Sequence, residues 1–372
     1  MRSICKSLLL LLALLLLAAT AAACGSKAQG GAGEPGAFDQ EKILVHGLQD
    51  QDLEITLGDL KKLPTVTKLA EASRSNGEKV RVSATGPLLD AFLQKYGKTQ
   101  RDFSRIRFTA KDRYSIAVPS DILANRQIIL SYINDGQPLE ADMQPVRVVI
   151  PGERAMYWVR DMIRIDLETG GDQKPPNRVV FLETAAKSLP QQDYEYFDSV
   201  DKAIKTSDLV RKYADGNDSS VTNVFLKAGD GLQKNETKAN FLSAFIKITG
   251  KDAPKFLAPQ FPQGMHIRDL LYIVYGQTVI FDFMEGSACL PRQTVEDKEG
   301  LAFSQIFKQT GLTGGHKYKF TSADGSGILL TIDDLGSGGL IYQNPQGALA
   351  FTCTGASGKK NIDDLLSIEA LP

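Results

Sequence analysis

Pro87-Leu-Leu-Asp-Ala-Phe-Leu-Gln-Lys-Tyr-Gly97 is the stretch that decides the fold, because its pattern occurs three times in the chain. Its leucine and phenylalanine side chains fall on one face of a helix, and the glycine can take the left-handed conformation that ends a helix. Residues 208–216 and 303–311 repeat this pattern and also end in glycine. We therefore expect three related units, each with a short helix that ends at its glycine.

A strand that runs into an aspartate turn follows each helix, at 106–112, 224–231 and 318–325. The spacing from the glycine to the turn aspartate is 15, 14 and 13 residues, and from there to a closing strand it is 47, 37 and 38. Alternating strand residues before a turn aspartate predict a β-hairpin. The sequence therefore predicts tandem α+β modules with mixed sheets and short helices.

An aspartate also opens each closing segment, in Arg160-Asp161, Arg268-Asp269 and Asp363-Asp364. Three acids at equivalent places cannot all belong to one catalytic site. We expect each of them to be a turn or backbone-capping residue.

The first 24 residues have the layout of a signal peptide. Arg2 and Lys6 precede an apolar run at 8–17, which is too short to cross about 30 Å of hydrocarbon as a membrane anchor. Small residues before Cys24 resemble a lipobox, which implies cleavage before Cys24 and attachment of palmitate-type lipid to its thiol. The alternative is an ordinary secretory signal with a chance cysteine.

Five segments are expected along the chain. Residues 25–40 are rich in Gly, Ala and Ser and predict a flexible tether. The boundaries are 1–24 for the signal peptide, 25–40 for the tether, 41–170 for module 1, 177–275 for module 2 and 276–372 for module 3. The protein is then lipid-anchored in the cell membrane or outer membrane, facing the exterior or periplasm, and Gly25 after the cysteine favours the outer membrane in a host with two.

Charge and composition exclude several classes of function. The chain has 43 basic and 44 acidic residues, so no nucleic-acid partner is indicated. After cleavage, Cys289 and Cys353 are the only cysteines besides Cys24, and in an oxidising compartment we expect them to form a disulfide, with two free thiols as the alternative. The three histidines have no metal-ligand spacing, and no nucleophile elbow or phosphate loop is present. We predict no metal site and no catalytic residues.

The first unit, from about 53 to 168, resembles the sulfite-oxidase-type, molybdopterin-binding fold family. The resemblance rests on Ile55-Thr-Leu-Gly-Asp-Leu-Lys-Lys-Leu-Pro64, Gly86-Pro-Leu-Leu-Asp-Ala-Phe-Leu93, Phe108-Thr-Ala-Lys-Asp-Arg-Tyr114 and Pro145-Val-Arg-Val-Val-Ile-Pro-Gly152. The second and third units keep less of it, mainly around Ala228-Gly-Asp-Gly231 and Ser322-Ala-Asp-Gly325. The resemblance implies the fold for all three modules, and for the first a molybdopterin pocket.

The chain differs from this family in the residue that would hold the metal. The family holds molybdenum through a cysteine thiolate between the Leu-Pro segment and the Gly-x-x-Leu helix, because soft anionic sulfur suits the metal. No cysteine lies between Leu63 and Gly86, and residues 1–6 lack the paired arginines that export a protein already loaded with cofactor. Both departures favour a non-catalytic binding or assembly protein without cofactor. The alternative is a molybdopterin-dependent oxidoreductase of the sulfite oxidase type.

Arginines and aromatic residues are concentrated in segments of module 1 that border the cofactor pocket in the family. Guanidinium groups recognise carboxylate, sulfate or phosphate through paired hydrogen bonds, and aromatic side chains exclude water from such a site. We therefore expect a small anionic ligand, or a protein partner, at a site formed by Arg107, Arg113, Tyr114, Arg147, Arg154 and Trp158. Two alternatives are a solvated face of strand arginines with Trp158 in the core, and modules packed so closely that no pocket stays open.

Overall fold

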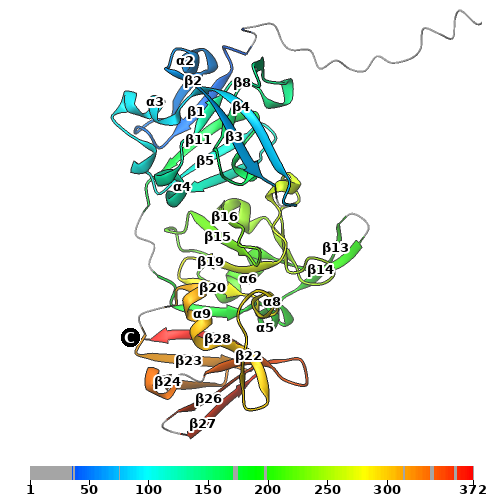
Figure 1. Cartoon of the computed structure of the whole chain (residues 1–372). Coiled ribbons are helices and arrows are strands. Elements are labelled where there is room, and N and C mark those ends of the chain that lie inside the picture. The colour runs from blue at the N-terminus through cyan, green and yellow to red at the C-terminus, as the bar shows by residue number, and fades with distance from the viewer. Residues whose placement is uncertain are drawn as a thin grey trace, which may run out of the picture.

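The structure is a computed structural model that describes residues 36, 38–74, 76–170, 175–196, 199–312, 315–335, 339–355 and 358–371. The signal segment, Cys24 and most of the tether lie outside the described residues. Within the described ranges, no helix has the length and apolar character needed to cross a membrane. Figure 1 shows the three modules stacked in chain order, from the blue N-terminal module to the red C-terminal strands.

Module 1 is built on a five-stranded sheet in the order β2-β1-β11-β5-β6, in which only β1 and β11 are parallel neighbours. Its strands are β1 (Lys42–His46), β2 (Leu53–Thr56), β3 (Thr65–Ser73), β4 (Lys79–Pro87), β5 (Arg105–Ala110), β6 (Ser115–Pro119), β7 (Ile129–Ser131), β8 (Ile133–Asn134), β9 (Gln137–Pro138), β10 (Arg147–Val149) and β11 (Met162–Glu168). Its helices are α2 (Leu57–Lys61), α3 (Leu89–Leu93) and α4 (Ser120–Asn125), with 3-10 turns η1 (Gln94–Tyr96), η2 (Gln100–Asp102), η3 (Ala141–Met143) and η4 (Ala155–Tyr157).

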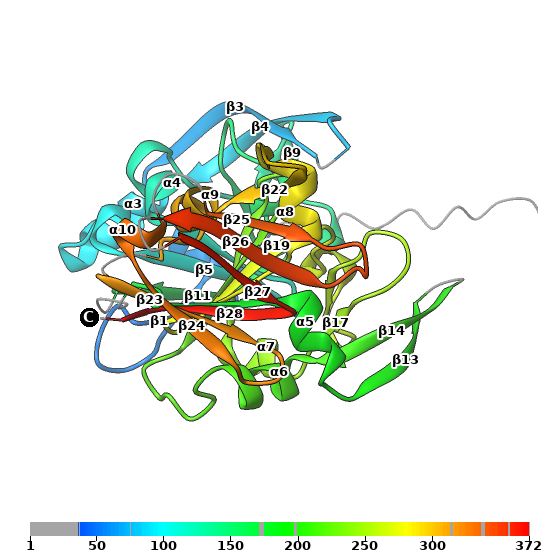
Figure 2. The same ribbon diagram turned by 90° about the horizontal axis from the view of Figure 1, so that it is seen from below.

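Module 2 repeats the order strand, helix, hairpin, helix, hairpin, helix and closing strand. Its strands are β12 (Arg178–Phe181), β13 (Gln191–Tyr196), β14 (Ser199–Lys205), β15 (Asn223–Ala228), β16 (Gln233–Thr237), β17 (Phe245–Lys247), β18 (Lys255–Leu257) and β19 (Leu270–Tyr275). Its helices are α5 (Leu182–Lys187), α6 (Thr206–Tyr213) and α7 (Lys238–Leu242), with the 3-10 turn η5 (Gln263–Met265). The β13–β14 hairpin projects from the body of the molecule in both views (Figures 1 and 2).

Module 3 follows the same order. Its strands are β20 (Thr278–Phe281), β21 (Gln293–Val295), β22 (Lys298–Ala302), β23 (Lys317–Ser322), β24 (Gly327–Thr331), β25 (Leu340–Gln343), β26 (Leu349–Gly355), β27 (Gly358–Asp363) and β28 (Leu365–Leu371). Its helices are α8 (Phe283–Cys289), α9 (Phe303–Thr310) and α10 (Ile332–Leu335). The predicted α+β class, with mixed sheets and short helices, is confirmed.

Modules 2 and 3 share one sheet of eight strands, in the order β16-β15-β19-β20-β12-β28-β23-β24. The first strand of module 3, β20, pairs with the closing strand of module 2, β19. In return β12, the first strand of module 2, pairs with β28, the closing strand of module 3, and with β20. The expected boundary at 275/276 therefore separates two runs of elements that complete each other's sheet.

The predicted turns are confirmed at the closing strands. Asp161, Asp269 and Asp364 have φ angles of 52°, 52° and 50°, so all three are left-handed. Each backbone carbonyl accepts a hydrogen bond from the loop of the neighbouring hairpin, from the N–H of Lys111, Gly229 and Ala323 respectively. The same device thus aligns the closing strand in every module.

Two of the three predicted helix ends are confirmed. Gly97 and Gly311 cap their helices with φ angles of 68° and 71°. The prediction is wrong for Gly216, because α6 ends at Tyr213 and the next residue, Ala214, is already extended.

The predicted disulfide between Cys289 and Cys353 is wrong, since both thiols are free. Cys353 lies in β26, between its neighbouring strands, and its side chain packs in the core of module 3. Cys289 is the last residue of α8 and is exposed. Partial burial raises the pKa of both thiols.

Candidate functional site

One face of the module 1 sheet is polar and the other is apolar. Ile106 and Phe108 of β5 point into the core, while the alternating residues Arg105, Arg107 and Thr109 point to the opposite face. On the neighbouring strand β11, the register places Glu168 beside Arg105, Asp166 beside Arg107 and Arg164 beside Thr109. The sheet therefore presents a row of matched charges outward, away from its own core.

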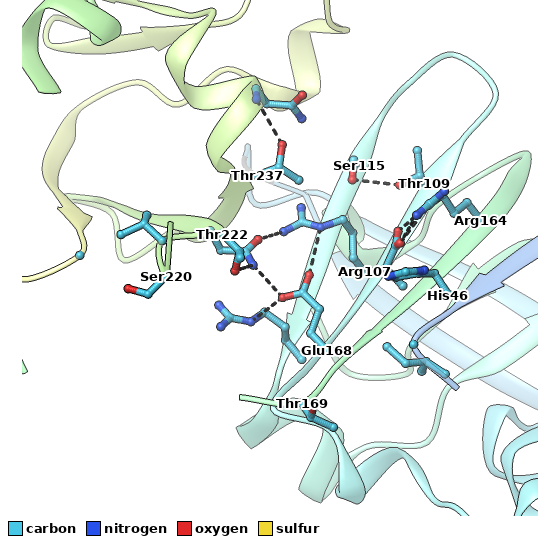
Figure 3. Close-up of a pocket in the computed structure, with 18 of the residues that line it drawn as sticks. His46, Arg107, Thr109, Ser115, Arg164, Glu168, Thr169, Ser220, Thr222 and Thr237 are labelled. Atoms are coloured by element: carbon cyan, nitrogen blue, oxygen red, sulfur yellow. Dashed lines mark hydrogen bonds and ion pairs between the residues drawn. The ribbon is translucent and has the colours of Figure 1, made fainter. Parts of the chain in front are cut away.

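Module 2 covers this polar face and leaves a cleft of about 1160 Å³ between the two modules. The module 1 wall is the polar sheet face together with His46, Arg113 and Ser115, and Figure 3 shows most of these residues as sticks. The opposite wall comes from module 2 and from Gln277 at the start of module 3, and it carries mainly hydroxyl and amide side chains: Ser220, Thr222, Asn223, Thr237, Asn240 and Gln277.

Arg107 joins the two walls. Its guanidinium donates to Oδ1 of Asn223 at 2.5 Å and to the carbonyl of Asn235 at 3.0 Å, and its Nε lies 3.4 Å from Glu168. Asn223 in turn donates to Glu168 at 2.9 Å, and Arg105 lies 2.9 Å from the same carboxylate. Figure 3 shows Arg107 and Glu168 between the strands of module 1 and the loop of module 2. Arg107, which the sequence predicted to bind ligand, therefore holds two modules together.

Most other charges of the cleft are also paired. Arg164 binds Asp166 through two nitrogens, with its Nε at 2.9 Å and Nη2 at 2.5 Å from Oδ1, and this hydrogen bonding raises the pKa of Arg164. His46 Nδ1 lies 2.5 Å from Oδ1 of Asp52. Asp218 accepts hydrogen bonds from the backbone and hydroxyl of Ser220.

Arg113 differs from the other arginines of the cleft. Its side chain is exposed and has no hydrogen-bond or ion-pair partner within the described ranges. Its φ angle of 71° is left-handed, which L side chains rarely adopt. In the equivalent turns of modules 2 and 3 this position is Gly231 and Gly325, with φ angles of 84° and 87°.

The predicted aromatic side chains line a different, smaller pocket of about 430 Å³. The Tyr114 hydroxyl donates to the carbonyl of Met156 at 2.8 Å, and the Trp158 indole donates to the carbonyl of Ile150 at 2.9 Å. Burial raises the pKa of Tyr114. Arg147 lies 5.2 Å from the centre of the Trp158 ring, and burial lowers its pKa.

Carboxylates dominate the charge of this second pocket. Asp112, Asp142 and Asp161 line it with a single arginine, Arg160, which lies 3.2 Å from Asp142. Burial raises the pKa of Asp161 to about 6. The charge of this pocket disfavours an anionic ligand.

Arg154, the last predicted residue, lines a third pocket of about 590 Å³. It donates to the carbonyl of Asp230 in module 2 at 3.3 Å, while Arg126 in the same pocket lies 2.8 Å from Glu153. The six predicted residues thus do not form one site. Arg107 and Arg113 reach the cleft, Tyr114 and Trp158 the second pocket, and Arg154 the third, with Arg147 against Trp158.

The residues of module 1 do not fit a molybdenum cofactor held through sulfur. The segment in which the resemblance requires a thiolate forms the β3–β4 hairpin, whose buried side chains include Ala70 and Ala72. No cysteine is present in this segment. Within the described ranges, no three His, Cys, Asp or Glu side chains are grouped so that they could hold a metal ion.

Sequence reasoning missed the polar sheet face and the module 2 wall. A signal was present, because Arg105, Arg107 and Thr109 alternate with apolar residues, as do Arg164, Asp166 and Glu168 with Ile165 and Leu167. This period of two predicts one polar sheet face. Nothing in the sequence indicates which loop of module 2 covers it.

Comparison with known proteins supports the assignment of module 1. Residues 35–175 match the family model of the oxidoreductase molybdopterin binding domain. The crystal structure of the sulfane dehydrogenase SoxCD from Paracoccus pantotrophus is 13% identical, over 80% of this chain and 79% of that one. Its TM-score is 0.32, so the similarity to this family rests on the family model alone. No curated protein matches the chain. Residues 35–175, the N-terminal module of this chain, are thus similar to the oxidoreductase molybdopterin-binding domains.

Proposed function

We propose that the protein is an extracytoplasmic lipoprotein that uses its molybdopterin-binding-like domain without a redox cofactor, as a binding protein for a small anionic ligand. The observation that carries the proposal is the segment between Leu63 and Gly86, which forms the β3–β4 hairpin and contains no cysteine where the resemblance requires the metal thiolate. A thiolate is the soft, anionic donor that holds molybdenum in this family.

The cleft between modules 1 and 2 supports the binding half of the proposal. It is larger than the pockets that Arg154 and Trp158 line, and arginines and hydroxyl groups converge there from two modules. Four arginines (Arg105, Arg107, Arg113 and Arg164) face three carboxylates (Asp166, Glu168 and Asp218), so the cleft has one positive charge in excess. An anionic ligand restores the balance.

The cofactor content of purified protein tests the proposal. We would express the full chain, and residues 25–372 without the export signal, in a host that makes molybdenum cofactor. The second form stays where the cofactor is inserted, so that export cannot explain an empty protein. A molybdenum enzyme made in the same cells is the loading control. We expect neither form to carry molybdenum or a releasable pterin, and one molybdenum atom per chain in either form would refute the proposal.

The lipid anchor, which lies outside the described residues, has its own test. Lipidation at Cys24 anchors the mature chain, so Cys24→Ala removes the acceptor thiol. We expect the wild type to take up labelled palmitate and to pellet with membranes, and the variant to do neither. A variant that still pellets and carries label would contradict the anchor.

A further inference from the structure

The turn between β5 and β6 differs from the equivalent turns of the other modules at one position. Gly231 and Gly325 take the left-handed conformation without steric conflict, because glycine has no Cβ. Arg113 takes the same conformation with a long side chain. A strained non-glycine residue in one of three equivalent turns is a candidate for a functional role, provided that its side chain faces a site.

The Arg113 side chain lines the cleft beside a row of polar groups. The register places Ser115, Thr109 and Arg164 side by side across β6, β5 and β11. The hydroxyls of Thr109 and Ser115 lie 3.1 Å apart, so each keeps hydrogen-bonding capacity for a ligand. The guanidinium of Arg164 is occupied by Asp166, whereas that of Arg113 has no partner within the described residues.

The rest of the cleft suits a ligand that carries many hydroxyl groups. The wall opposite module 1 offers Ser, Thr, Asn and Gln side chains, which both donate and accept hydrogen bonds. Phe261 is half-buried and adds one apolar surface, against which the C–H face of a ring can pack. A volume of about 1160 Å³ exceeds the needs of a single inorganic oxyanion.

From these observations we infer that the cleft binds an acidic saccharide, whose carboxylate pairs with Arg113 and whose hydroxyl groups bind the polar side chains of both walls. A guanidinium binds a carboxylate through two parallel hydrogen bonds, which the sugar hydroxyls cannot supply. The inference rests on the proposed function. It adds the class of ligand and names Arg113 as the residue that binds the carboxylate of the ligand.

Calorimetric titration of the mature chain with trigalacturonate tests the inference. We expect wild-type protein to bind this acidic trisaccharide and to bind the uncharged galactotriose, which lacks all three carboxylates, at least about tenfold more weakly, because the loss of even one charged hydrogen-bonding partner has about that effect. Arg113→Gly should weaken trigalacturonate binding by a similar factor without lowering the melting temperature, because glycine relieves the left-handed strain. Arg160→Ala is the matched control, since Arg160 is exposed in the same module but does not line the cleft, and its binding should equal that of the wild type.

Three outcomes would overturn the inference. The first is wild-type protein that binds neither trisaccharide, the second is equal affinity for both, and the third is an unchanged affinity in Arg113→Gly. Each would show that Arg113 does not bind an acidic saccharide in this cleft. Sodium sulfate is a separate titrant: binding of sulfate without binding of trigalacturonate would replace the saccharide by a small oxyanion. Failure of the proposed function is seen separately, as molybdenum in the purified protein.

Discussion

Arg107 shows what a charged residue contributes when it is almost completely buried. Its side chain is 4% exposed, and its guanidinium contacts Glu168 of its own module and Asn223 and Asn235 of the next. Burial of a charge is costly, and hydrogen bonds to fixed partners offset that cost. Loss of the arginine leaves the partner carboxylate with less compensation, so Arg107 stabilises the contact between modules 1 and 2.

We expect Arg107→Ala to lower the free energy of unfolding by about 3 kcal/mol, within the range for one partner removed from a buried ion pair. Urea unfolding of the mature chain measures the difference. Arg292→Ala is the control, because Arg292 is exposed and lies 3.5 Å from Glu299, and such surface pairs contribute at most about 1 kcal/mol. Equal losses in the two variants would mean that Arg107 does not hold the modules together.

The left-handed aspartates permit a second test at the level of one residue. Asp364 has a φ angle of 50°, which costs a β-carbon-bearing residue about 1 kcal/mol relative to glycine. Both Asp364→Ala and Asp364→Gly lose the carboxylate and its contact to Lys187, so their difference isolates the backbone. We expect the glycine variant to be the more stable of the two by about 1 kcal/mol in chemical denaturation. An alanine variant as stable as the glycine variant would show that the turn relaxes.

At the scale of elements, the first turns of α5 and α8 bring two carboxyl groups together where modules 2 and 3 exchange strands. Glu183 accepts a hydrogen bond from the backbone N–H of Met284 at 2.8 Å, and Asp282 caps α8 by accepting from the N–H of Glu285 at 2.7 Å. Burial raises the pKa of Asp282 to about 7 and that of Glu183 well above its usual value, and the neighbouring carboxylates, Glu285 for Asp282 and Asp282 for Glu183, raise them further. Both groups therefore keep a proton to higher pH than an ordinary carboxyl group does.

The raised pKa of Asp282 predicts how stability depends on pH. The folded state holds the proton more tightly than the unfolded state, so stability falls as pH rises from about 4, the unfolded pKa, to about 7, the folded pKa. Asp282→Asn keeps a capping side chain and removes the charge, so we expect its unfolding free energy to fall less over this range. Chemical denaturation at a series of pH values measures both slopes, with Asp297→Asn, an exposed loop position, as the control. Parallel slopes in wild type and Asp282→Asn would contradict the raised pKa of Asp282.

At the scale of the whole molecule, modules 2 and 3 form one folding unit. Within this unit β12 lies between β20 and β28, both of which belong to module 3, and its residues reach the cores on both faces of the sheet. A fragment that stops at residue 275 would leave β12 without either neighbour and β19 without β20. Unpaired buried strands lose their hydrogen bonds together with their apolar contacts.

We therefore expect residues 177–275 to remain unfolded in isolation, whereas residues 175–372 unfold in a single cooperative transition. Circular dichroism during thermal unfolding, together with amide exchange, distinguishes the two behaviours. A folded 177–275 fragment with protected amides in β12 would show that the strand exchange is not needed for its stability.

Local features of this molecule could be predicted from the sequence, and non-local ones could not. The α+β class, the hairpins and the turns at Asp161, Asp269 and Asp364 follow from residues close together in the chain. The prediction of a helix end at Gly216 is wrong because Ala214 already leaves the helix. The partner of Arg107 lies 116 residues away, and the exchange of β12 and β20 depends on which faces meet in space, so neither could be read from periodicity. The predicted disulfide is wrong for the same reason, since the presence of two cysteines does not indicate which elements lie between them in the fold.

The candidate site was predictable only in part. Sequence reasoning placed arginines in the correct module but combined side chains from three different pockets, because it had no means to assign strand faces across the fold. The missing thiolate, by contrast, is a local fact about residues 63–86 and could be stated from the sequence alone.

The central claim is that this molybdopterin-binding-type domain works without molybdenum. The most direct test is the ratio of molybdenum to protein in the lipoprotein extracted from its native membrane, measured by elemental mass spectrometry beside a quantified peptide standard. We predict a ratio far below one atom per chain and no pterin on acid release. A ratio of one, with a releasable pterin, would contradict this claim and favour the alternative function, a molybdopterin-dependent oxidoreductase.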